Sequence, residues 1–369
     1  MESFKILDYL YSLNLSPIYI NVIGAFLVSF FITIISIPKI IRVSHRKQLM
    51  DVPGHRSSHI KKVPTLGGVG IYFALVLSYS IFSSEINSNY SFFLSSITIL
   101  FFVGLMDDLL VVAPDKKLYA QITSSLLIIF GSGIQIFTFG GLFGIYDLPF
   151  WVSVPFTIFV FIILNNAYNL IDGIDGLAGI VGIIISFAFI FIFYRIYDYS
   201  AGTLSVALLA SLLGFLRYNL SHRFKIFMGD TGSMVVGFIL TFLLIRFLYI
   251  SSQPSYSLDT APVIVLFIFV IPIVDTASVI IIRLLKGKHP LKPDKNHLHH
   301  QLIYLGLNHH QSSIILGLVN VVFILIAFVL RRENINLLFL LFIIISVSFV
   351  TFIHYLVLKK KNKLKLNEK

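Results

Sequence analysis

The chain has 369 residues, of which 57% are hydrophobic and only 12% charged, with a net charge of +11 and a mean hydropathy of +0.91. Soluble globular proteins carry about 25% charged residues, so this composition excludes a water-soluble particle and predicts an integral membrane protein. The chain contains no cysteine, which excludes disulfides and thiolate chemistry and leaves the compartment open.

Apolar tracts long enough to cross a bilayer follow one another along the whole chain. A span takes roughly 17–25 residues, and on this measure we predict about 11 spans. They lie near residues 17–38, 68–84, 90–106, 118–133, 149–168, 174–194, 200–218, 231–250, 261–283, 312–330 and 335–357. The first tract lacks a basic leader and a cleavage site, so it is interpreted as a span and not as a signal peptide. The expected fold is an all-α polytopic bundle that forms a single domain over residues 1–369.

The basic residues predict how this bundle is oriented. If alternate loops share a side, most of the 28 Lys and Arg residues fall on one side, although Arg331 and Arg332 do not. The positive-inside rule makes that side cytoplasmic, with the N-terminus outside and the C-terminus inside. The outer loops are short and carry few candidate catalytic groups. The basic tail KKKNKLKLNEK indicates a topology anchor near anionic lipid, and no nucleic acid is expected as a partner.

Five aspartates stand at the ends of apolar tracts on the predicted cytoplasmic side. They are Asp107 and Asp108 in GLMDDLL, Asp172 and Asp175 in NAYNLIDGIDGLAG, and Asp230 in FMGDTGS. Carboxylates near lipid are costly, so each needs a functional reason. The first two are also unfavourable at a helix C-terminus, so that a metal ion or the nearby Lys116 and Lys117 must compensate them. We expect the five to form one acidic pocket for a divalent metal and a phosphorylated substrate.

Two of these motifs have further structural features. Asn166, Asn169 and Asp172 recur every third residue and would share one helix face, next to the glycine-flanked Asp175. Asp230 opens a span, where it either caps the helix or binds a metal while the free N–H groups face an anion. Because four other acids are expected on the same side, metal binding is favoured for Asp230.

The first inner loop, MDVPGHRSSHIKKVPTLGGVG, is rich in cationic groups. Arg56, His59 and Lys61 precede a Pro-x-x-Gly-Gly turn whose glycines permit close backbone approach. The lysines are equally compatible with a positive-inside anchor. The cluster of Arg56 and His59 before the turn favours contact with phosphate.

The last inner loop contains His297, His299 and His300. A closed zinc site would need a fourth ligand at a suitable spacing, and the neighbouring lysines favour a loop that binds pyrophosphate. Asp275, inside the ninth tract, is expected to be structural and to pair with an Asn, Thr or Arg group of a neighbouring helix.

These segments resemble a known family. The motifs are D-x-P-x-x-R-x-x-H (Asp51 to His59), P-x-x-G-G (Pro64 to Gly68), the Asp107–Asp108 pair, NAYNLIDGIDGLAG, FMGDTGS and PDKNHLHHQL, in this order. Through them, residues of about 40–305 resemble the polyprenyl-phosphate N-acetylhexosamine-1-phosphate transferases of glycosyltransferase family 4. Residues 306–369 would add two further spans and a basic cytoplasmic tail.

Details of the motifs refine the resemblance. The H-x-H-H pattern is similar to that of the N-acetylglucosamine branch, because the muramoyl-pentapeptide branch usually shows a contiguous histidine triplet followed by Phe-Glu. Two features depart from the family pattern. Ser57 and Ser58 stand where a Lys is often found, and Asn219 lies one residue farther from Asp230 than in many members.

The resemblance implies a Mg²⁺-dependent enzyme, with Mn²⁺ as a substitute, at the cytoplasmic face of the bacterial inner membrane. It would transfer N-acetylhexosamine-1-phosphate, in the first place GlcNAc-1-phosphate, from the UDP-sugar to undecaprenyl phosphate and release UMP. The product would start a cell-envelope polysaccharide. Another UDP-amino-sugar donor, of the QuiNAc, FucNAc or phospho-MurNAc-pentapeptide type, is the alternative, and a homodimer is left open.

The resemblance also implies roles for the residues. Asp230 and Asp108 would hold the metal, and Asp107 would orient or deprotonate the lipid phosphate, or carry a phospho-Asp intermediate. His299 completes the catalytic set. Substrate binding is assigned to Arg56, His59, Lys61, Asn166, Asn169, Asp172, Asp175, Asn219, Phe227, His297 and His300. Replacing Asp230 by Asn should abolish turnover, whereas Asp275→Asn should cost much less.

Two rival interpretations belong to other classes of protein. Acids within a membrane often mark the ion path of a coupled transporter. Transporter acids, however, tend to lie near the bilayer midplane, whereas these stand at helix ends on one side. A non-catalytic scaffold would leave the acids unexplained.

Overall fold

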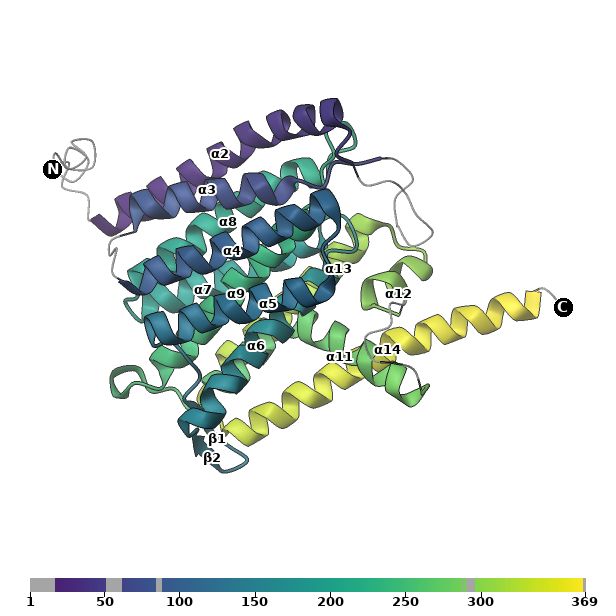
Figure 1. Ribbon diagram of the computed structural model, residues 1–369. Coiled ribbons are helices and arrows are strands. Elements are labelled where there is room, and N and C mark those ends of the chain that lie inside the picture. Colours follow the sequence, from purple (N-terminus) through teal and green to yellow (C-terminus); the bar gives the residue numbers. More distant parts are fainter. Residues whose placement is uncertain (1–16, 51–61, 84–87, 288, 290–295, 368–369) are drawn as a thin grey trace. The chain divides into compact units, whose positions relative to one another are not determined.

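The computed structural model describes residues 17–50, 62–83, 88–287, 289 and 296–367, and it is mostly helical (Figure 1). The α-helices are α2 (Pro17–Lys47), α3 (Gly67–Phe82), α4 (Ser88–Leu110), α5 (Pro114–Leu126), α6 (Phe150–Ile171), α7 (Leu177–Arg195), α8 (Tyr199–Asn219), α9 (Gly229–Ser251), α10 (Ala261–Ile268), α11 (Val270–Leu285), α12 (Leu298–Tyr304), α13 (His309–Val329) and α14 (Ile335–Asn367). The shorter elements are a π-helical turn, η1 (Leu127–Gly131), a 3₁₀ turn, η2 (Pro254–Tyr256), and the strands β1 (Thr138–Leu142) and β2 (Ile145–Asp147).

Within the described ranges, eight helices are long and apolar enough to cross a membrane, namely α2, α4, α6, α7, α8, α9, α13 and α14. The pair α10 and α11, bent by 80°, adds a ninth span if the two are counted as one. Two further apolar tracts form the shorter helices α3, of 16 residues, and α5, of 13 residues. A mostly helical, multi-pass membrane protein is therefore confirmed. The larger number of spans, the orientation of the termini and the single domain stay predictions.

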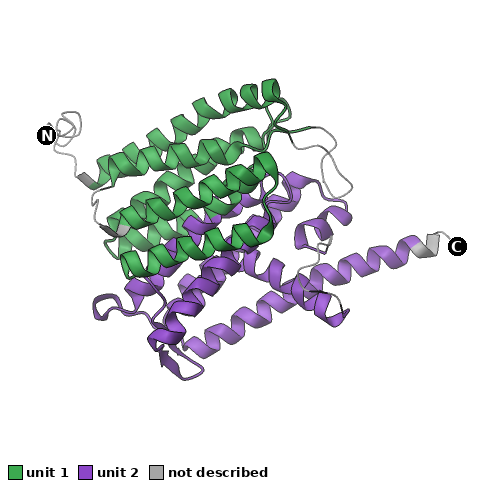
Figure 2. Cartoon of the chain, viewed as in Figure 1, with its two compact units in different colours: residues 1–52, 61–133, 186–236 green, residues 53–60, 134–185, 237–369 purple. Residues whose placement is uncertain are grey.

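The chain divides into two compact units, coloured separately in Figure 2. Unit 1 comprises residues 1–52, 61–133 and 186–236, and unit 2 comprises residues 53–60, 134–185 and 237–369. Helices α7 and α9 each contribute residues to both units.

In unit 1, the helices α2, α3 and α8 pack against one another. Buried hydroxyl groups find backbone acceptors across this packing. Ser29 Oγ donates to the carbonyl of Ala207 at 2.7 Å, and Ser78 Oγ donates to that of Ala25 at 2.7 Å. Such bonds satisfy polar groups where no water competes, and they fix the relative register of the helices.

Glycines allow α3 and α4 to reach the first turn of α9. A Cβ atom added at Gly68 of α3 would lie 2.1 Å from the backbone nitrogen of Gly232, and one added at Gly104 of α4 would lie 2.6 Å from Thr231 Cα. Only a residue without a side chain fits at such distances. The start of α9, which carries Asp230, is thereby enclosed by backbone on two sides.

In unit 2, α11 packs against α6, and α13 packs against both α10 and α11. The bend between α10 and α11 leaves helix-end carbonyls without partners in their own helix. Asn320 Nδ2 of α13 donates to the carbonyl of Ile268, the last residue of α10, at 3.0 Å. A neighbouring helix thus satisfies the broken backbone, as a break inside a membrane requires.

One of the predicted outer loops contains an antiparallel hairpin. Strands β1 and β2 pair with Thr138 opposite Asp147 and Leu142 opposite Ile145. Gly140 has φ +63°, and a Cβ atom there would lie 2.1 Å from the carbonyl oxygen of Asp259. The hairpin therefore depends on a glycine where it meets the segment before α10.

Candidate functional site

Three of the five predicted acids come together in unit 1. Asp107 and Asp108 lie in the last turn of α4, and Asp230 lies in the first turn of α9. Lys117 of α5 connects two of them, because its Nζ donates to Asp107 Oδ2 at 2.6 Å and to Asp230 Oδ2 at 2.8 Å. Asp107 Oδ1 accepts from the backbone N–H of Val112 at 2.6 Å. Two carboxylates thus share one cation.

The electrostatics of this cluster agree with the dipole argument. Burial alone would lower the pKa of the Lys117 ammonium, but its hydrogen bonds to Asp107 and Asp230 outweigh burial and raise that pKa above its ordinary value. Lys117 is therefore firmly protonated, and it supplies the compensating positive charge that two carboxylates at a helix C-terminus need. The side chain of Asp230 is 32% exposed and that of Asp107 10%, so Asp230 is the more accessible of the two.

Asp108 makes a different set of contacts. Its Oδ1 accepts from the backbone N–H of Asp230 at 2.9 Å, and its Oδ2 accepts from the N–H of Thr231 at 3.0 Å and from Thr231 Oγ1 at 2.5 Å. Asp108 thus takes the place of a helix cap for α9, at the end of a helix where negative charge is favourable. Gly229 has φ +71°, and a Cβ atom there would lie 2.6 Å from Asp108 Oδ2. The turn before Asp230 consequently requires glycine.

The segment before α9 is held by backbone hydrogen bonds. The N–H groups of Gly67 and Gly68 donate to the carbonyls of Phe227 at 3.0 Å and Met228 at 2.8 Å. Phe227 N–H donates in turn to the carbonyl of Pro64 at 2.8 Å. Gly67 and Gly68, expected to permit close backbone approach, are thus approached by the backbone of the segment before α9.

Phe227 and Asn219, both predicted to bind substrate, lie next to this contact. The Phe227 ring is half-buried, with the Lys225 ammonium 5.4 Å from its centroid. Asn219 is buried, and its Nδ2 donates to the carbonyl of Ile226 at 2.9 Å. Asn219 therefore holds the segment that presents Phe227. Contact of either residue with substrate stays a prediction.

The other two acids belong to unit 2, where they follow α6. Asn166 and Asn169 lie on α6, whose C-cap is Asp172. Asp175 Oδ2 lies 3.1 Å from His309 Nδ1 of α13, and its backbone carbonyl accepts from Ser313 Oγ at 2.8 Å. The turn that contains both aspartates is thus fixed to the first turns of α13. That all five acids share one pocket stays a prediction.

The histidine segment lies at α12 in unit 2. His297 is the N-cap of α12, while His299 and His300 lie in its first turn. The rings of His297 and His299 are stacked with centroids 5.6 Å apart, and those of His299 and His300 are 4.3 Å apart. At the other end of α12, Lys360 Nζ of α14 donates to the carbonyl of Tyr304 at 2.8 Å. A basic side chain thus meets the negative end of the helix.

His299 is buried, and its environment keeps it neutral. Burial lowers the pKa of His299 to about 3, and the charge of Asp275 offsets this only in part. A Cβ atom at Gly173, in the turn after Asp172, would lie 2.6 Å from His299 Nε2. In this arrangement His299 can form hydrogen bonds but contributes no positive charge to a site.

Asp275 has a partner that the sequence did not indicate. Its oxygens contact His297 and the backbone of Leu298, at 2.7 and 2.6 Å. Among the described residues these partners stand in place of the Asn, Thr or Arg group that was suggested. Thr231 and His309 are two other residues that sequence reasoning missed. The DTGS motif could have indicated Thr231, whereas His309 is distant in sequence from Asp175 and carries no signal. Arg56, His59 and Lys61 lie outside the described residues.

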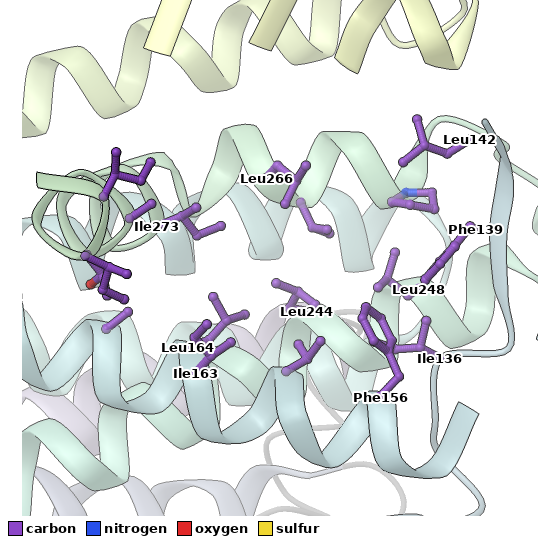
Figure 3. A pocket seen from close by; sticks show the side chains of 18 residues that line it. Ile136, Phe139, Leu142, Phe156, Ile163, Leu164, Leu244, Leu248, Leu266 and Ile273 are labelled. Atoms are coloured by element: carbon purple, nitrogen blue, oxygen red, sulfur yellow. The ribbon is translucent and has the colours of Figure 1, made fainter. Parts of the chain in front are cut away.

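Unit 2 also contains an apolar cavity of about 480 Å³ (Figure 3). Side chains from β1, α6, α9, α10 and α11 point into it, among them Phe139, Phe156, Leu244 and Ile273. Thr276 is the one polar residue among the 18 that line it. A cavity of this composition suits a hydrocarbon chain and not a polar ligand.

Apolar helices long enough to span a membrane, an acidic cluster where α4 ends and α9 begins, and an apolar cavity are the features of a multi-pass membrane protein with a candidate site. Comparison with known proteins gives its family. A family model described as glycosyl transferase family 4 matches residues 90–248. A relative from Bacillus subtilis (strain 168), named as a probable undecaprenyl-phosphate N-acetylglucosaminyl 1-phosphate transferase, is 32% identical over 333 residues, which are 88% of this chain and 90% of the relative.

Two further relatives carry the name undecaprenyl-phosphate alpha-N-acetylglucosaminyl 1-phosphate transferase. The one from Yersinia pestis is 25% identical over 283 residues, and the one from Escherichia coli (strain K12) is 26% identical over 284 residues, in each case 75% of both chains. The chain belongs to glycosyl transferase family 4.

Proposed function

We propose that this protein transfers N-acetylglucosamine-1-phosphate from UDP-N-acetylglucosamine to undecaprenyl phosphate and releases UMP. The observation that carries the proposal is the similarity to the Bacillus subtilis relative, which extends over 88% of this chain. The family match over residues 90–248 spans all five acids of the candidate site. The lipid diphosphate sugar would start a cell-envelope polysaccharide. The positive-inside pattern supports an active site on the cytoplasmic face of the bacterial inner membrane.

A divalent cation suits the acidic cluster of unit 1. Oxygens of Asp107 and Asp230 lie within hydrogen-bond distance of one ammonium, at 2.6 and 2.8 Å, so both can face a single cation. Mg²⁺ prefers oxygen ligands and is usually bound by one or two carboxylates, with waters and substrate phosphates as the remaining ligands. In the described part of the chain, no three His, Asp or Glu side chains are grouped as a complete metal site.

Asp230, the more exposed acid, is our proposed principal ligand. For the second ligand, the geometry supports Asp107 rather than the predicted Asp108, whose oxygens already accept three hydrogen bonds from the start of α9. Mg²⁺ bound there would neutralise charge on the substrate phosphates and keep their oxygens in line. Mn²⁺ is expected to substitute for it.

The residues of the cluster then act on the two anionic substrates. An oxygen of the lipid phosphate attacks the β-phosphorus of the donor. The new P–O bond forms as the bond between that phosphorus and the bridging oxygen breaks, and the electron pair leaves with UMP. Asp107 orients the lipid phosphate and accepts its proton if it carries one. Lys117, which is firmly protonated, stabilises the negative charge that the two phosphates bring together.

For the remaining residues we keep the roles predicted from sequence. Asn169, Asp172 and Asp175 would bind the nucleotide-sugar, Phe227 would stack on uracil, and the histidines of α12 would bind the diphosphate. The apolar cavity of unit 2 is lined by hydrocarbon side chains apart from Thr276, so a long hydrocarbon chain such as that of a polyprenyl lipid would suit it. The cavity therefore supports a lipid acceptor with a long hydrocarbon chain.

The test is a reconstitution with a panel of donors. Purified protein is incubated with undecaprenyl phosphate, Mg²⁺ and one UDP-amino-sugar at a time, and lipid products are identified by mass spectrometry while UMP is measured in parallel. UDP-N-acetylglucosamine should give the lipid diphosphate sugar with equal amounts of UMP, and Asp230→Asn should give neither. Product with a different donor alone would replace the proposed donor. No product with any donor, together with ion or solute flux in proteoliposomes, would favour the transporter interpretation.

A further inference from the structure

Asp275 is a buried carboxylate in the middle of an apolar helix. It lies on α11, it is 1% exposed, and most residues around it in the chain are aliphatic. Burying a carboxylate costs several kcal/mol unless hydrogen bonds compensate it, and apolar residues of similar volume often pack at least as well. Packing alone therefore does not account for an acid at this position.

Both oxygens of Asp275 are used by the histidine segment. Oδ2 lies 2.7 Å from His297 Nδ1, and Oδ1 accepts from the backbone N–H of Leu298 at 2.6 Å. His297 is the N-cap of α12 but makes no side-chain capping bond. Asp275 supplies the missing acceptor for the first N–H of α12 from a different helix. One carboxylate thus fixes both a ring and the start of the helix that follows it.

The contact also determines which nitrogen of His297 is free. An ionised carboxylate only accepts hydrogen bonds, so His297 Nδ1 carries the proton and Nε2 is left for another partner. The rings of His299 and His300 follow within one turn of α12, and His299 stacks on His297 at 5.6 Å. The place of all three rings therefore depends on the position of His297.

We propose that Asp275 is a positioning residue for the transfer reaction, acting through His297. It fixes the Nδ1–H tautomer of that ring and the start of α12, and it presents the lone pair of His297 Nε2 to a proton-bearing group of the substrate, such as a protonated phosphate oxygen or a sugar hydroxyl. The inference rests on the proposed function, which assigns the histidine segment to the diphosphate. Such orienting partners typically change activity by about 10–100-fold when they are removed, although they touch no substrate.

A double-mutant cycle tests the coupling, with UMP release as the assay. The variants are Asp275→Asn, His297→Gln and the two combined. Asp275→Asn should lower kcat by about 10-fold or more, with less than about a threefold change in the KM of either substrate. Because Asp275 acts through His297, the double variant should be no slower than His297→Gln alone, within about twofold. Ser278→Ala is the matched control, since Ser278 Oγ donates to the backbone carbonyl of Asp275, at 2.9 Å, and not to its carboxylate, and it should retain turnover.

Two outcomes of the cycle would overturn the proposal. One is an Asp275→Asn enzyme within about twofold of wild type. The other is a double variant whose loss equals the product of the two single losses, because independent residues give multiplicative effects. Wild-type protein without activity toward any donor would instead contradict the proposed function.

A second measurement needs no Asp275 variant and no activity. In ¹⁵N-histidine-labelled protein at alkaline pH, nitrogen NMR distinguishes the two neutral tautomers of each ring. The signal that disappears in His297→Gln should have Nδ1 protonated and Nε2 unprotonated. If that signal shows the opposite tautomer, His297 does not donate to Asp275 and the proposal is wrong, whatever the kinetics show.

Discussion

Gly68→Ala is expected to separate α3 from α9 and to displace the acidic cluster. The added methyl group would lie 2.1 Å from the nitrogen of Gly232, 2.3 Å from its Cα and 2.8 Å from the carbonyl carbon of Thr231. All three are backbone atoms, which cannot rotate away as a side chain can. Since ordinary contact begins near 3.4 Å, the two helices must move apart by more than about 1 Å.

The cost of this movement follows from the bonds it breaks. The N–H groups of Gly67 and Gly68 bond to the carbonyls of Phe227 and Met228 at 3.0 and 2.8 Å, and a shift of that size takes both beyond bonding distance. Each lost bond costs about 1–3 kcal/mol where its partners are buried. The better helix propensity of Ala returns roughly 0.5–1 kcal/mol. A net loss of about 1–5 kcal/mol is expected, together with at least a tenfold loss of turnover, because small displacements of reacting groups reduce rates strongly.

The measurement is thermal unfolding in detergent, followed by tyrosine and tryptophan fluorescence, with UMP release in parallel. Gly70→Ala on the same helix is the matched control. Its Cβ atom would meet side chains only, Ile37 Cγ1 and Ser36 Oγ at 3.1 Å, which can yield by a few tenths of an ångström. If Gly68→Ala unfolds and turns over like Gly70→Ala, the close approach of α3 and α9 does not position the site.

Three further predictions concern single side chains. Asp108→Asn should lower the free energy of unfolding by about 1–3 kcal/mol, because Asp108 holds the start of α9 through Asp230 and Thr231. The stabilisation that Mg²⁺ induces should remain, and its loss at unchanged stability would restore Asp108 as a metal ligand. Lys117→Met should lower turnover and yet tighten Mg²⁺ binding, because the Lys117 ammonium and the metal would occupy the same position between Asp107 and Asp230. Tighter binding is measured as thermal stabilisation at a lower Mg²⁺ concentration. Weaker binding would contradict this shared position. Burial lowers the pKa of His299 from 6.5 to about 3, so between pH 8 and pH 5 only the unfolded state gains a proton at this ring, and the wild type should lose roughly 2 kcal/mol of its free energy of unfolding. His299→Gln should lack this part of the loss. Equal pH dependence of stability in both proteins would refute a buried neutral ring.

The helices and part of the acidic cluster were predictable from local sequence. Each predicted span coincides with a described helix or a pair of elements, because the length of an apolar tract and its membrane environment decide the secondary structure. The need for a cation near Asp107 followed from the helix dipole, and Lys117 meets it at 2.6 Å. Both arguments use only residues that are near in sequence.

What could not be predicted depends on contacts between distant segments. The bond between Asp108 and Thr231 joins residues 123 positions apart, and nothing in either motif specifies the other. Gly67 and Gly68 indicated close backbone approach, but sequence could not say whether a ligand or the segment before α9 approaches them. Asp275 was expected to be structural. Its contact with His297 depends on where the start of α12 lies relative to α11, which the sequence spacing of the two residues does not indicate. The roles of the site residues themselves stay predictions.

The length of α14 has a practical consequence for work with this protein. Its 33 residues extend about 50 Å, whereas the hydrocarbon of a bilayer is about 30 Å thick. The surplus turns at its lysine-rich end continue to α12, where Lys360 meets Tyr304 at 2.8 Å. A C-terminal truncation that removes Lys360 would therefore remove a contact that supports the C-terminal end of α12. A chain shortened only after Asn367 would keep this contact.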